Sequence, residues 1–402
     1  MRELVLTAPA QRLHGEILAR LMRAGASSRT QLADAAGVDV STIVRALPEL
    51  VAAGWISETV DQMQARTRGR PIKRVAVRGG HHLAIGVKIG PERIVGAVTD
   101  LAGDVIAAGT SPLDTRDPDR VLAAVSEMVR VLAGRGLAVV DQPEARVVGL
   151  GVGVGGHVSK GRVVTSPILG WQGVEVSTVL AAATRLPTVV ANDVNALAAG
   201  EHLLGYGRRV DDLAVLTIGR GLGCGLVLHG RLLVGADGAA GEFGHLPLIP
   251  DGPPCGCGGR GCLETVASDR ALVAAVRART GDADVCELGD VERLAAAGDQ
   301  VALECLATTG ELLGRGIAAL VNLVNPALVI VAGEMVSVID HLEAPMRRAA
   351  AEHAFSSAWS NCRLKIDRGG DEMWARGAAW LAIRAAVMRP ETFARVSPEV
   401  AV

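Results

Sequence analysis

The sequence predicts a chain of two kinds of fold: a small helical domain with a β-hairpin over residues 1–80, and a larger α/β body after it. Three observations predict this arrangement. Apolar residues recur at helical spacing near the start, strand-like and helix-like segments alternate from about residue 83, and 402 residues exceed one ordinary domain. Only 2% of the residues are aromatic against 49% hydrophobic, so the core must be mainly aliphatic.

Three consecutive helices are predicted over 11–23, over 31–36 and from about Ser41 to residue 53. Gly37 ends the second helix. The N-cap candidates of that helix are Ser27, Ser28 and Thr30. The predicted buried stripe of the third helix consists of Ile43, Val44, Leu47, Leu50 and Val51.

A short helix, a glycine-containing turn and a longer helix make the helix-turn-helix pattern, which places the start of its second helix in the major groove of DNA. Ser41, Thr42 and Arg45 are polar, lie early in the last predicted helix and avoid its apolar stripe. We expect these three residues to contact bases or phosphates. The alternative is a plain three-helix bundle with solvated polar residues.

A basic hairpin follows the predicted helices. Strand-like segments at 55–58 and 73–77 flank a loop, and six basic residues but no acidic one lie from Arg66 to Arg78. This pattern is typical of a wing, in which Arg68 and Arg70 are expected to enter the minor groove. Residues 1–80 carry a net charge of +5 and the remainder −7, which also favours a polyanionic partner. The alternative is a solvated basic loop.

The body is predicted to alternate strands and helices. A helix is expected over 118–133, capped by Asp117 and ended by Gly134. The other predicted elements are a strand over 146–154 that enters a glycine-rich turn at 151–156, a strand over 186–191 and a hairpin over 211–230 around Gly219-Arg220-Gly221.

Three of the seven cysteines, Cys255, Cys257 and Cys262, lie within eight residues. This uneven distribution does not suggest a disulfide framework, and in a cytoplasmic protein it favours a metal site. The sequence has no run of 18 apolar residues and no charged-then-apolar leader. We therefore expect a soluble, cytoplasmic protein that does not enter a membrane.

Four segments resemble, in order, motifs of the ROK family, which groups repressors, open reading frames of unknown role and sugar kinases. They are NDVNALAAGE (192–201), GAAGEFGH (238–245), CGCGGRGCLE (255–264) and LVNPALVIVAG (323–333). The resemblance covers about residues 83–390, and the N-terminal domain matches the regulatory members. It implies the two-lobed actin-like, or ribonuclease-H-like, sugar-kinase fold. The first lobe is expected over 83–200, completed by a helix at about 372–388, and the second over 201–371.

The resemblance also implies two sets of site residues. His245 joins Cys255, Cys257 and Cys262 in a closed Cys₃His site for structural Zn²⁺, the alternative being free buried thiols. The implied ligand-binding residues are Asn192, Asp193, Glu242, His245 and Glu264. Such groups suit a polyol, and the family's kinases use the aspartate as general base.

Several positions depart from the kinase pattern. Ile168 stands where the kinases commonly carry an asparagine that contacts sugar, so one sugar contact that the resemblance implies is missing. The first phosphate segment reads Lys88-Ile-Gly-Pro91-Glu92 in place of Asp-x-Gly-Gly-Thr, and the second contains Arg220 in place of threonine. Because phosphoryl transfer depends on metal binding and charge neutralisation, these changes predict that kinase activity is lost and that Asp193 is a vestigial base.

The leading hypothesis is a transcriptional regulator, with repression favoured, that binds a double-stranded DNA operator as a homodimer or homotetramer. A small sugar-like effector between the lobes would control its DNA affinity. The second hypothesis is an ATP-dependent sugar kinase with a DNA-binding arm. The third is a regulator whose cleft is vestigial and binds no ligand.

Overall fold

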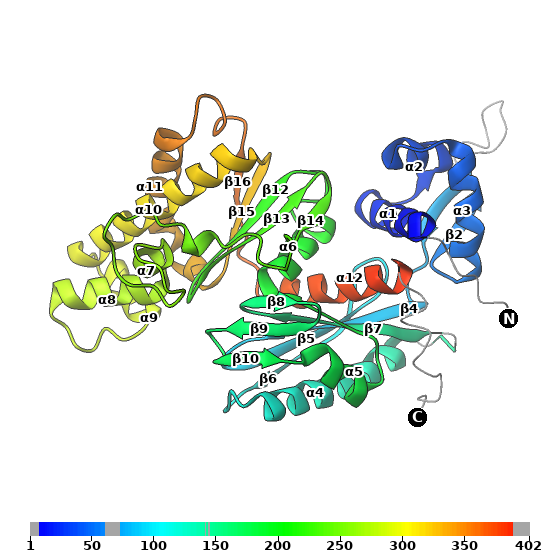
Figure 1. Ribbon diagram of the computed structural model, residues 1–402, viewed down its shortest axis with the longest axis horizontal. Helices are drawn as coiled ribbons and strands as arrows, with labels where there is room; N and C mark the ends of the chain where they lie inside the picture. Colours follow the sequence, from blue (N-terminus) through cyan, green and yellow to red (C-terminus); the bar gives the residue numbers. More distant parts are fainter. Residues whose placement is uncertain (1–7, 61–72, 141, 144, 389–402) are drawn as a thin grey trace. The chain divides into compact units, whose positions relative to one another are not determined.

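The computed structural model describes residues 8–60, 73–140, 142–143 and 145–388 and divides into two compact units (Figure 1). The first unit contains the residues up to Arg209 and those from Asp371 onward, and the second unit is Val210–Gly370. Helix α6 (Asp193–Leu204) runs past residue 200, so the chain enters the second unit later than the sequence suggests. None of the described helices is long and apolar enough to cross a membrane.

The N-terminal domain has the predicted helix-turn-helix. Its helices are α1 (Ala8–Ala24), α2 (Arg29–Ala36) and α3 (Val40–Ala52). Ser28 caps α2 in a capping box with Gln31, and Gly37 ends it at a positive φ of 62°. A small antiparallel sheet has the order β1-β3-β2, with β1 (Ser27–Ser28), β2 (Ile56–Val60) and β3 (Lys73–Val77). The predicted wing tip, residues 61–72, lies outside the described residues.

The predicted stripe of α3 needs a correction. Val44 and Val51 are 40% and 41% exposed and do not belong to the core. The buried residues of α3 are Ile43, Ala46, Leu47 and Leu50, which follow one narrow face of the helix. The spacing of apolar residues identified the helix correctly, but the predicted buried stripe also included two positions at the border of the buried face.

The first unit contains a five-stranded sheet of order β11-β7-β4-β5-β6. The strands are β4 (His82–Ile89), β5 (Arg93–Thr99), β6 (Val105–Pro112), β7 (Arg146–Val154) and β11 (Thr188–Asn192). Strands β4, β5 and β6 pair antiparallel, whereas β4, β7 and β11 pair in parallel. A small sheet contains β8 (His157–Ser159), β9 (Arg162–Ser166) and β10 (Trp171–Val174). The accompanying helices are α4 (Pro118–Val140), α5 (Val176–Thr184), α6 and α12 (Glu372–Met388).

The second unit repeats this topology. Its sheet has the order β14-β13-β12-β15-β16, with β12 (Leu213–Ile218), β13 (Leu222–Leu228), β14 (Arg231–Leu233), β15 (Leu328–Ala332) and β16 (Arg363–Ile366). Again three strands are antiparallel and the last two are added in parallel. The helices of this unit are η1 (Phe243–His245), α7 (Glu264–Ala267), α8 (Asp269–Thr280), α9 (Leu288–Ala296), α10 (Gln300–Val324), η2 (Glu334–Val338) and α11 (Ile339–His353). Two units of one topology agree with the expected two-lobed fold.

Two glycine predictions were wrong. Helix α4 does not end at Gly134 but continues to Val140, and Gly136 within it packs tightly on Val98, where a β-carbon would lie 2.8 Å from Val98 Cγ1. Gly151 belongs to β7 rather than to a turn. A β-carbon on Gly151 would lie 1.8 Å from the carbonyl oxygen of Ala378, so this glycine lets α12 lie directly on the sheet.

Candidate metal centre, ligand residues and nucleic-acid interface

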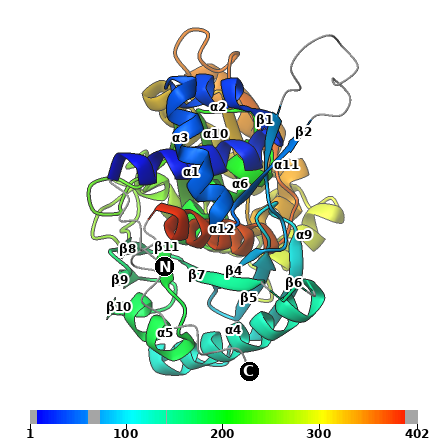
Figure 2. The same ribbon diagram turned by 90° about the vertical axis from the view of Figure 1, so that its right-hand side faces the viewer.

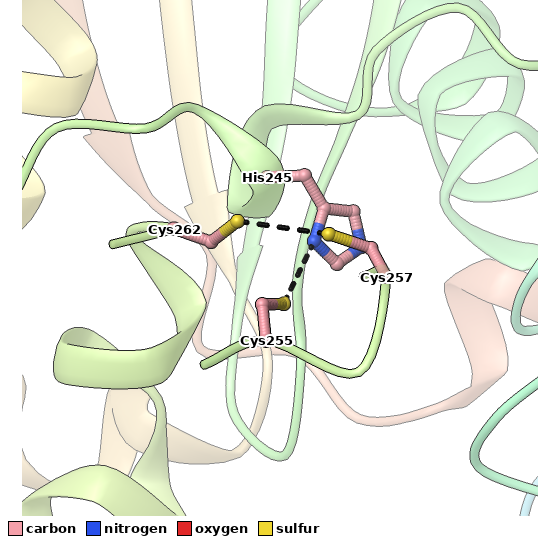
Figure 3. Close-up of side chains that lie close together, drawn as sticks. All are labelled: His245, Cys255, Cys257 and Cys262. Atoms are coloured by element: carbon pink, nitrogen blue, oxygen red, sulfur yellow. Dashed lines mark hydrogen bonds between the residues drawn. The ribbon is translucent and has the colours of Figure 1, made fainter. Parts of the chain in front are cut away.

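The second unit brings His245, Cys255, Cys257 and Cys262 together (Figure 3). The Nδ1 atom of His245 lies 3.5 Å from Cys255 Sγ, and Cys257 Sγ lies 3.7 Å from Cys262 Sγ. All four ligand atoms lie within 4.8 Å of one another. Thiolates around one tetrahedral Zn²⁺ at about 2.3 Å are roughly 3.8 Å apart. The four atoms can therefore hold one metal ion.

The loop that carries the three thiols is shaped by its own backbone. The Cys255 N–H donates to the Gly259 carbonyl, and the Gly258 N–H donates to the Cys255 carbonyl. Gly258 adopts a positive φ of 93°, which a side chain disfavours. Cys224 lies outside the cluster, and burial raises the pKa of its thiol to about 12, as expected for an inert core cysteine.

Three predicted ligand residues gather beside this centre. Nε2 of His245, the ring nitrogen not directed at Cys255, lies 3.9 Å from Glu242 Oε2. Glu264 accepts a 3.0 Å hydrogen bond from the Leu222 N–H. Gly244 lies against Glu264, because a β-carbon on this glycine would be 3.3 Å from Glu264 Cβ. One histidine can therefore serve the metal through one nitrogen and a ligand through the other.

The other two ligand candidates begin α6 in the first unit. The Asn192 side-chain amide donates to the Gly156 carbonyl at 2.9 Å, and its oxygen accepts from the Asn195 N–H at 3.1 Å. Asn192 thus fixes the turn and caps the helix. The Asp193 carboxylate accepts from the Val194 N–H at 3.0 Å. Asp193 lies in the first turn of α6, where the backbone N–H groups point toward its side chain.

Ile168 lies beside this carboxylate. A β-carbon on Gly155 would lie 3.4 Å from Asp193 Oδ2 and 3.6 Å from Ile168 Cδ1. The carboxylate and the Ile168 methyl therefore flank the same small space above Gly155. Ile168, in place of the asparagine that is common in the family's kinases, therefore gives Asp193 a hydrocarbon neighbour instead of a polar one.

The side chain of Lys88, in the first phosphate segment, forms contacts with other residues of the first unit. Its Nζ lies 2.8 Å from Asp371 Oδ1 and 3.6 Å from the centre of the Trp374 ring. Arg93 donates to the other Asp371 oxygen at 2.7 Å. Burial alone would raise the pKa of Asp371, but Lys88 and Arg93 outweigh it and hold the pKa below its usual value. Asp371 and Trp374 lie far along the chain from Lys88, so no local pattern in the sequence indicated these two contacts.

The second phosphate segment is bordered by acidic side chains. Glu334 packs on Gly219 so closely that a β-carbon there would be 1.8 Å from the Glu334 carboxylate. A β-carbon on Gly221 would lie 3.0 Å from Glu264 Oε2. Burial, with Glu334 nearby, raises the pKa of Asp269. Glu334 and Asp269 were not identified from the sequence, because nothing in the local pattern places them beside residues 219–221.

The candidate DNA-contacting residues of α3 form one surface patch. Ser41 and Arg45 are exposed and Thr42 is half-buried. The Arg45 guanidinium donates to the Ser41 carbonyl at 3.3 Å and to the Thr42 hydroxyl at 3.4 Å. Arg68 and Arg70, the two predicted minor-groove residues, lie outside the described residues.

The winged helix-turn-helix defines an N-terminal domain of a DNA-binding type. The two sheets of one topology and the Cys₃His cluster define a following region of the sugar-kinase type. A model of the ROK family matches residues 84–385, and the chain belongs to that family. The xylose repressor of Bacillus subtilis is 24% identical over 368 residues, which cover 91% of this chain and 94% of the repressor. The glucokinase of Streptomyces coelicolor is 31% identical over 294 residues, which cover 69% of this chain and 90% of the kinase.

Solved structures show the same two-part similarity. A ROK family transcriptional regulator described as a homolog of the Escherichia coli MLC protein aligns with a TM-score of 0.81 and 27% identity, covering 96% of this chain and all of that one. A ROK family glucokinase from Streptomyces griseus, solved with glucose and AMPPNP, aligns with a TM-score of 0.64 and 29% identity. It covers 75% of this chain and 99% of the kinase. The regulator therefore matches the whole organisation, whereas the kinase matches the body.

Proposed function

We propose that this chain is a transcriptional repressor of sugar-related genes, controlled by a small sugar-like effector. The observation that carries the proposal is the polar surface patch of Ser41, Thr42 and Arg45 at the start of the second helix of a helix-turn-helix, on a chain that also has side chains suited to a polyol. The full-length similarity to a xylose repressor and to a ROK family regulator supports it. In this proposal Arg68 and Arg70 of the wing bind the minor groove.

The proposed ligand-binding residues are Asp193 of the first unit and Glu242, His245 and Glu264 of the second unit. Asn192 contributes by fixing the turn before Asp193, because its amide is engaged with Gly156 and Asn195. Ile168 offers hydrocarbon beside Asp193, so the ligand presents a C–H or methyl group there rather than a hydroxyl.

Zn²⁺ is the metal proposed for His245, Cys255, Cys257 and Cys262. Three thiolates and one imidazole match its preferred donors and leave no open position, so its role is structural. The ion would hold the loop 255–262 against η1 and so fix His245 beside Glu242.

The alternative function, an ATP-dependent sugar kinase, is disfavoured by both phosphate segments. Lys88 engages Asp371 where a kinase needs an acidic group for magnesium, and Glu334 lies on Gly219 where phosphate would have to approach. Asp193 is the feature that motivates the alternative. Incubation with ATP, magnesium and a panel of sugars tests it, and sustained turnover that Asp193→Asn abolishes would establish the kinase.

The repressor proposal is tested by electrophoretic mobility shift with genomic fragments at several salt concentrations. We expect one or a few fragments to bind far more tightly than random DNA, as a homodimer or homotetramer on paired half-sites. A thermal-shift screen with sugars then identifies the effector, since a ligand of the native state raises the melting temperature. If no fragment binds better than random DNA, the proposal fails. The proposed location is the cytoplasm.

A further inference from the structure

The turn that leaves the recognition helix α3 is clamped by the first residues of the body. Gly54 and Trp55 form this turn before β2. The Trp55 ring stacks on His82 with 4.0 Å between ring centroids and 7° between planes. The neighbouring His81 ring lies against Gly54, where a β-carbon would be 2.5 Å from it. Two histidines at the start of the body therefore enclose the exit of the DNA-binding helix.

His82 is itself held rigidly. It is fully buried, Trp55 is 8% exposed, and an Arg146 N–H lies 3.1 Å from His82 Nε2. Arg146 can only donate, so this contact requires a neutral His82 that accepts through Nε2. His82 is also the first residue of β4, the central strand of the first unit. The clamp thus connects the recognition helix to the middle of the sheet.

A second contact joins the same domain to the body along α1 (Figure 1 and Figure 2). Residues of α1, α3, α6 and α12 share one core cluster, including Ile17, Leu21, Leu203, Trp380 and Ile383. A β-carbon on Gly15 of α1 would lie 2.8 Å from Met388 Cγ of α12.

Two hydrogen bonds extend this contact beyond the apolar residues. Arg208 donates to the Met22 carbonyl at 3.0 Å, and Arg23 donates to the Arg208 carbonyl at 3.0 Å. Trp55 belongs to the same core cluster as Ile17 and Trp380, so the N-terminal domain meets the rest of the first unit over one continuous apolar interface. The stacked ring at one end and the Arg208 and Arg23 hydrogen bonds at the other leave this domain little freedom to rotate.

We propose that Trp55 and His82 are positioning residues that make the winged helix and the first unit one rigid body, so that an assembled dimer accepts only one spacing of DNA half-sites. This inference rests on the proposed DNA-binding function and goes beyond it. The effector then changes the position of one protomer's first unit relative to that of its partner, and each DNA-binding domain moves together with its own first unit. In support, α6 begins at the ligand residue Asp193 and α12 follows directly after Asp371, and both helices pack on α1.

The test uses the full-length protein and no effector. Half-site sequences are selected from random DNA with the wild-type protein, and affinity is then measured on paired half-sites with stepwise spacers and on one half-site alone. Wild type is expected to prefer its best spacing by about tenfold over spacers two base pairs longer or shorter. Trp55→Ala and His82→Ala should reduce that preference to about twofold while changing single-half-site affinity by less than about twofold.

Trp55→Phe keeps a ring over His82 and should retain the wild-type spacing preference. His229→Ala is the matched control, because the His229 side chain is 94% exposed in the second unit. An unchanged spacing preference in Trp55→Ala and His82→Ala overturns the inference, as does a wild type with no spacing preference. Loss of single-half-site binding in those variants also overturns it, because the residues would then only support the fold. If wild type selects no DNA at all, the proposed function fails first.

Discussion

Lys88 and Asp371 lie 283 positions apart in the sequence and form a 2.8 Å ion pair in which the lysine is only 12% exposed. Lys88→Met is expected to lower the free energy of unfolding by about 1–3 kcal/mol, because Asp371 stays partly buried with Arg93 as its remaining cation. Arg93→Met should cost less, since Arg93 is 57% exposed. Urea denaturation measures both, and equal losses would contradict this ranking.

Removal of the metal should destabilise the second unit. Purified protein is expected to contain about one Zn²⁺ per chain, and Cys257→Ser should lose it and lower the melting temperature by several degrees. Elemental analysis and calorimetry measure the two effects. Cys286→Ser is the control, because Cys286 is exposed and outside the cluster. A wild type purified without metal whose melting temperature does not respond to added zinc would contradict the zinc assignment.

Stability should fall as the solution is acidified below pH 6.5. Burial, assisted by Arg146, lowers the pKa of His82 from 6.5 to about 3. The unfolded chain therefore takes up a proton at this residue before the folded chain does, which favours unfolding. Between pH 7 and pH 5 the cost from His82 is about 2 kcal/mol. His14 contributes in the same direction, since burial also lowers its pKa.

Chemical denaturation of wild type and His82→Gln at several pH values measures this loss. The variant lacks the titrating ring, so its stability should fall less steeply between pH 7 and pH 5. His229→Gln, at an exposed position, should retain the wild-type slope. Parallel curves for wild type and His82→Gln would show that His82 is not the responsible group.

Ile168→Asn should change which sugars bind. An amide beside Asp193 can exchange hydrogen bonds with a hydroxyl that Ile168 cannot satisfy. We expect the variant to bind a fully hydroxylated aldose about tenfold more tightly than wild type does, relative to the matching deoxy sugar. Thermal-shift titrations with D-xylose, D-glucose and their deoxy analogues measure the difference. The same preference in both proteins would place the ligand away from Ile168.

Arg45→Ala should weaken operator binding. If Arg45 reads a base, the loss is about 1–3 kcal/mol and sequence preference relaxes at one position. If it binds phosphate, binding weakens equally on all sequences and the salt dependence falls by about one ion. Arg130→Ala is the matched control, because this exposed arginine lies on α4. Unchanged affinity of Arg45→Ala would remove Arg45 from the interface.

The parts of the fold that could be predicted from the sequence are those that depend on residues close together in the chain. The N-cap at Ser28, one of three predicted candidates, the turn at Gly37 and the Cys255–Cys262 loop each involve neighbours in the chain, so local spacing indicates them. The contact of Lys88 with Asp371 and that of Glu334 with Gly219 join distant residues and have no local signature.

The same limit explains the errors at Gly134 and Val44. A glycine inside a helix costs only about 1 kcal/mol, which the packing of later residues such as Gly136 can offset, and a border position of an apolar stripe is buried only if another element covers it. Both outcomes depend on neighbours that are distant in the sequence. The relative placement of Asp193 and Ile168 is of the same kind, because two separate segments meet at Gly155.

The position of helix α12 in the sequence affects the order in which the parts of the first unit can fold. It packs on α1 and on the central sheet of the first unit, yet a ribosome makes it only after all of Val210–Gly370. The N-terminal domain therefore emerges first but lacks part of its support until the last helix has been synthesised. A chain truncated before Glu372 would lack α12, so α1 would lose the apolar residues of α12 against which it packs.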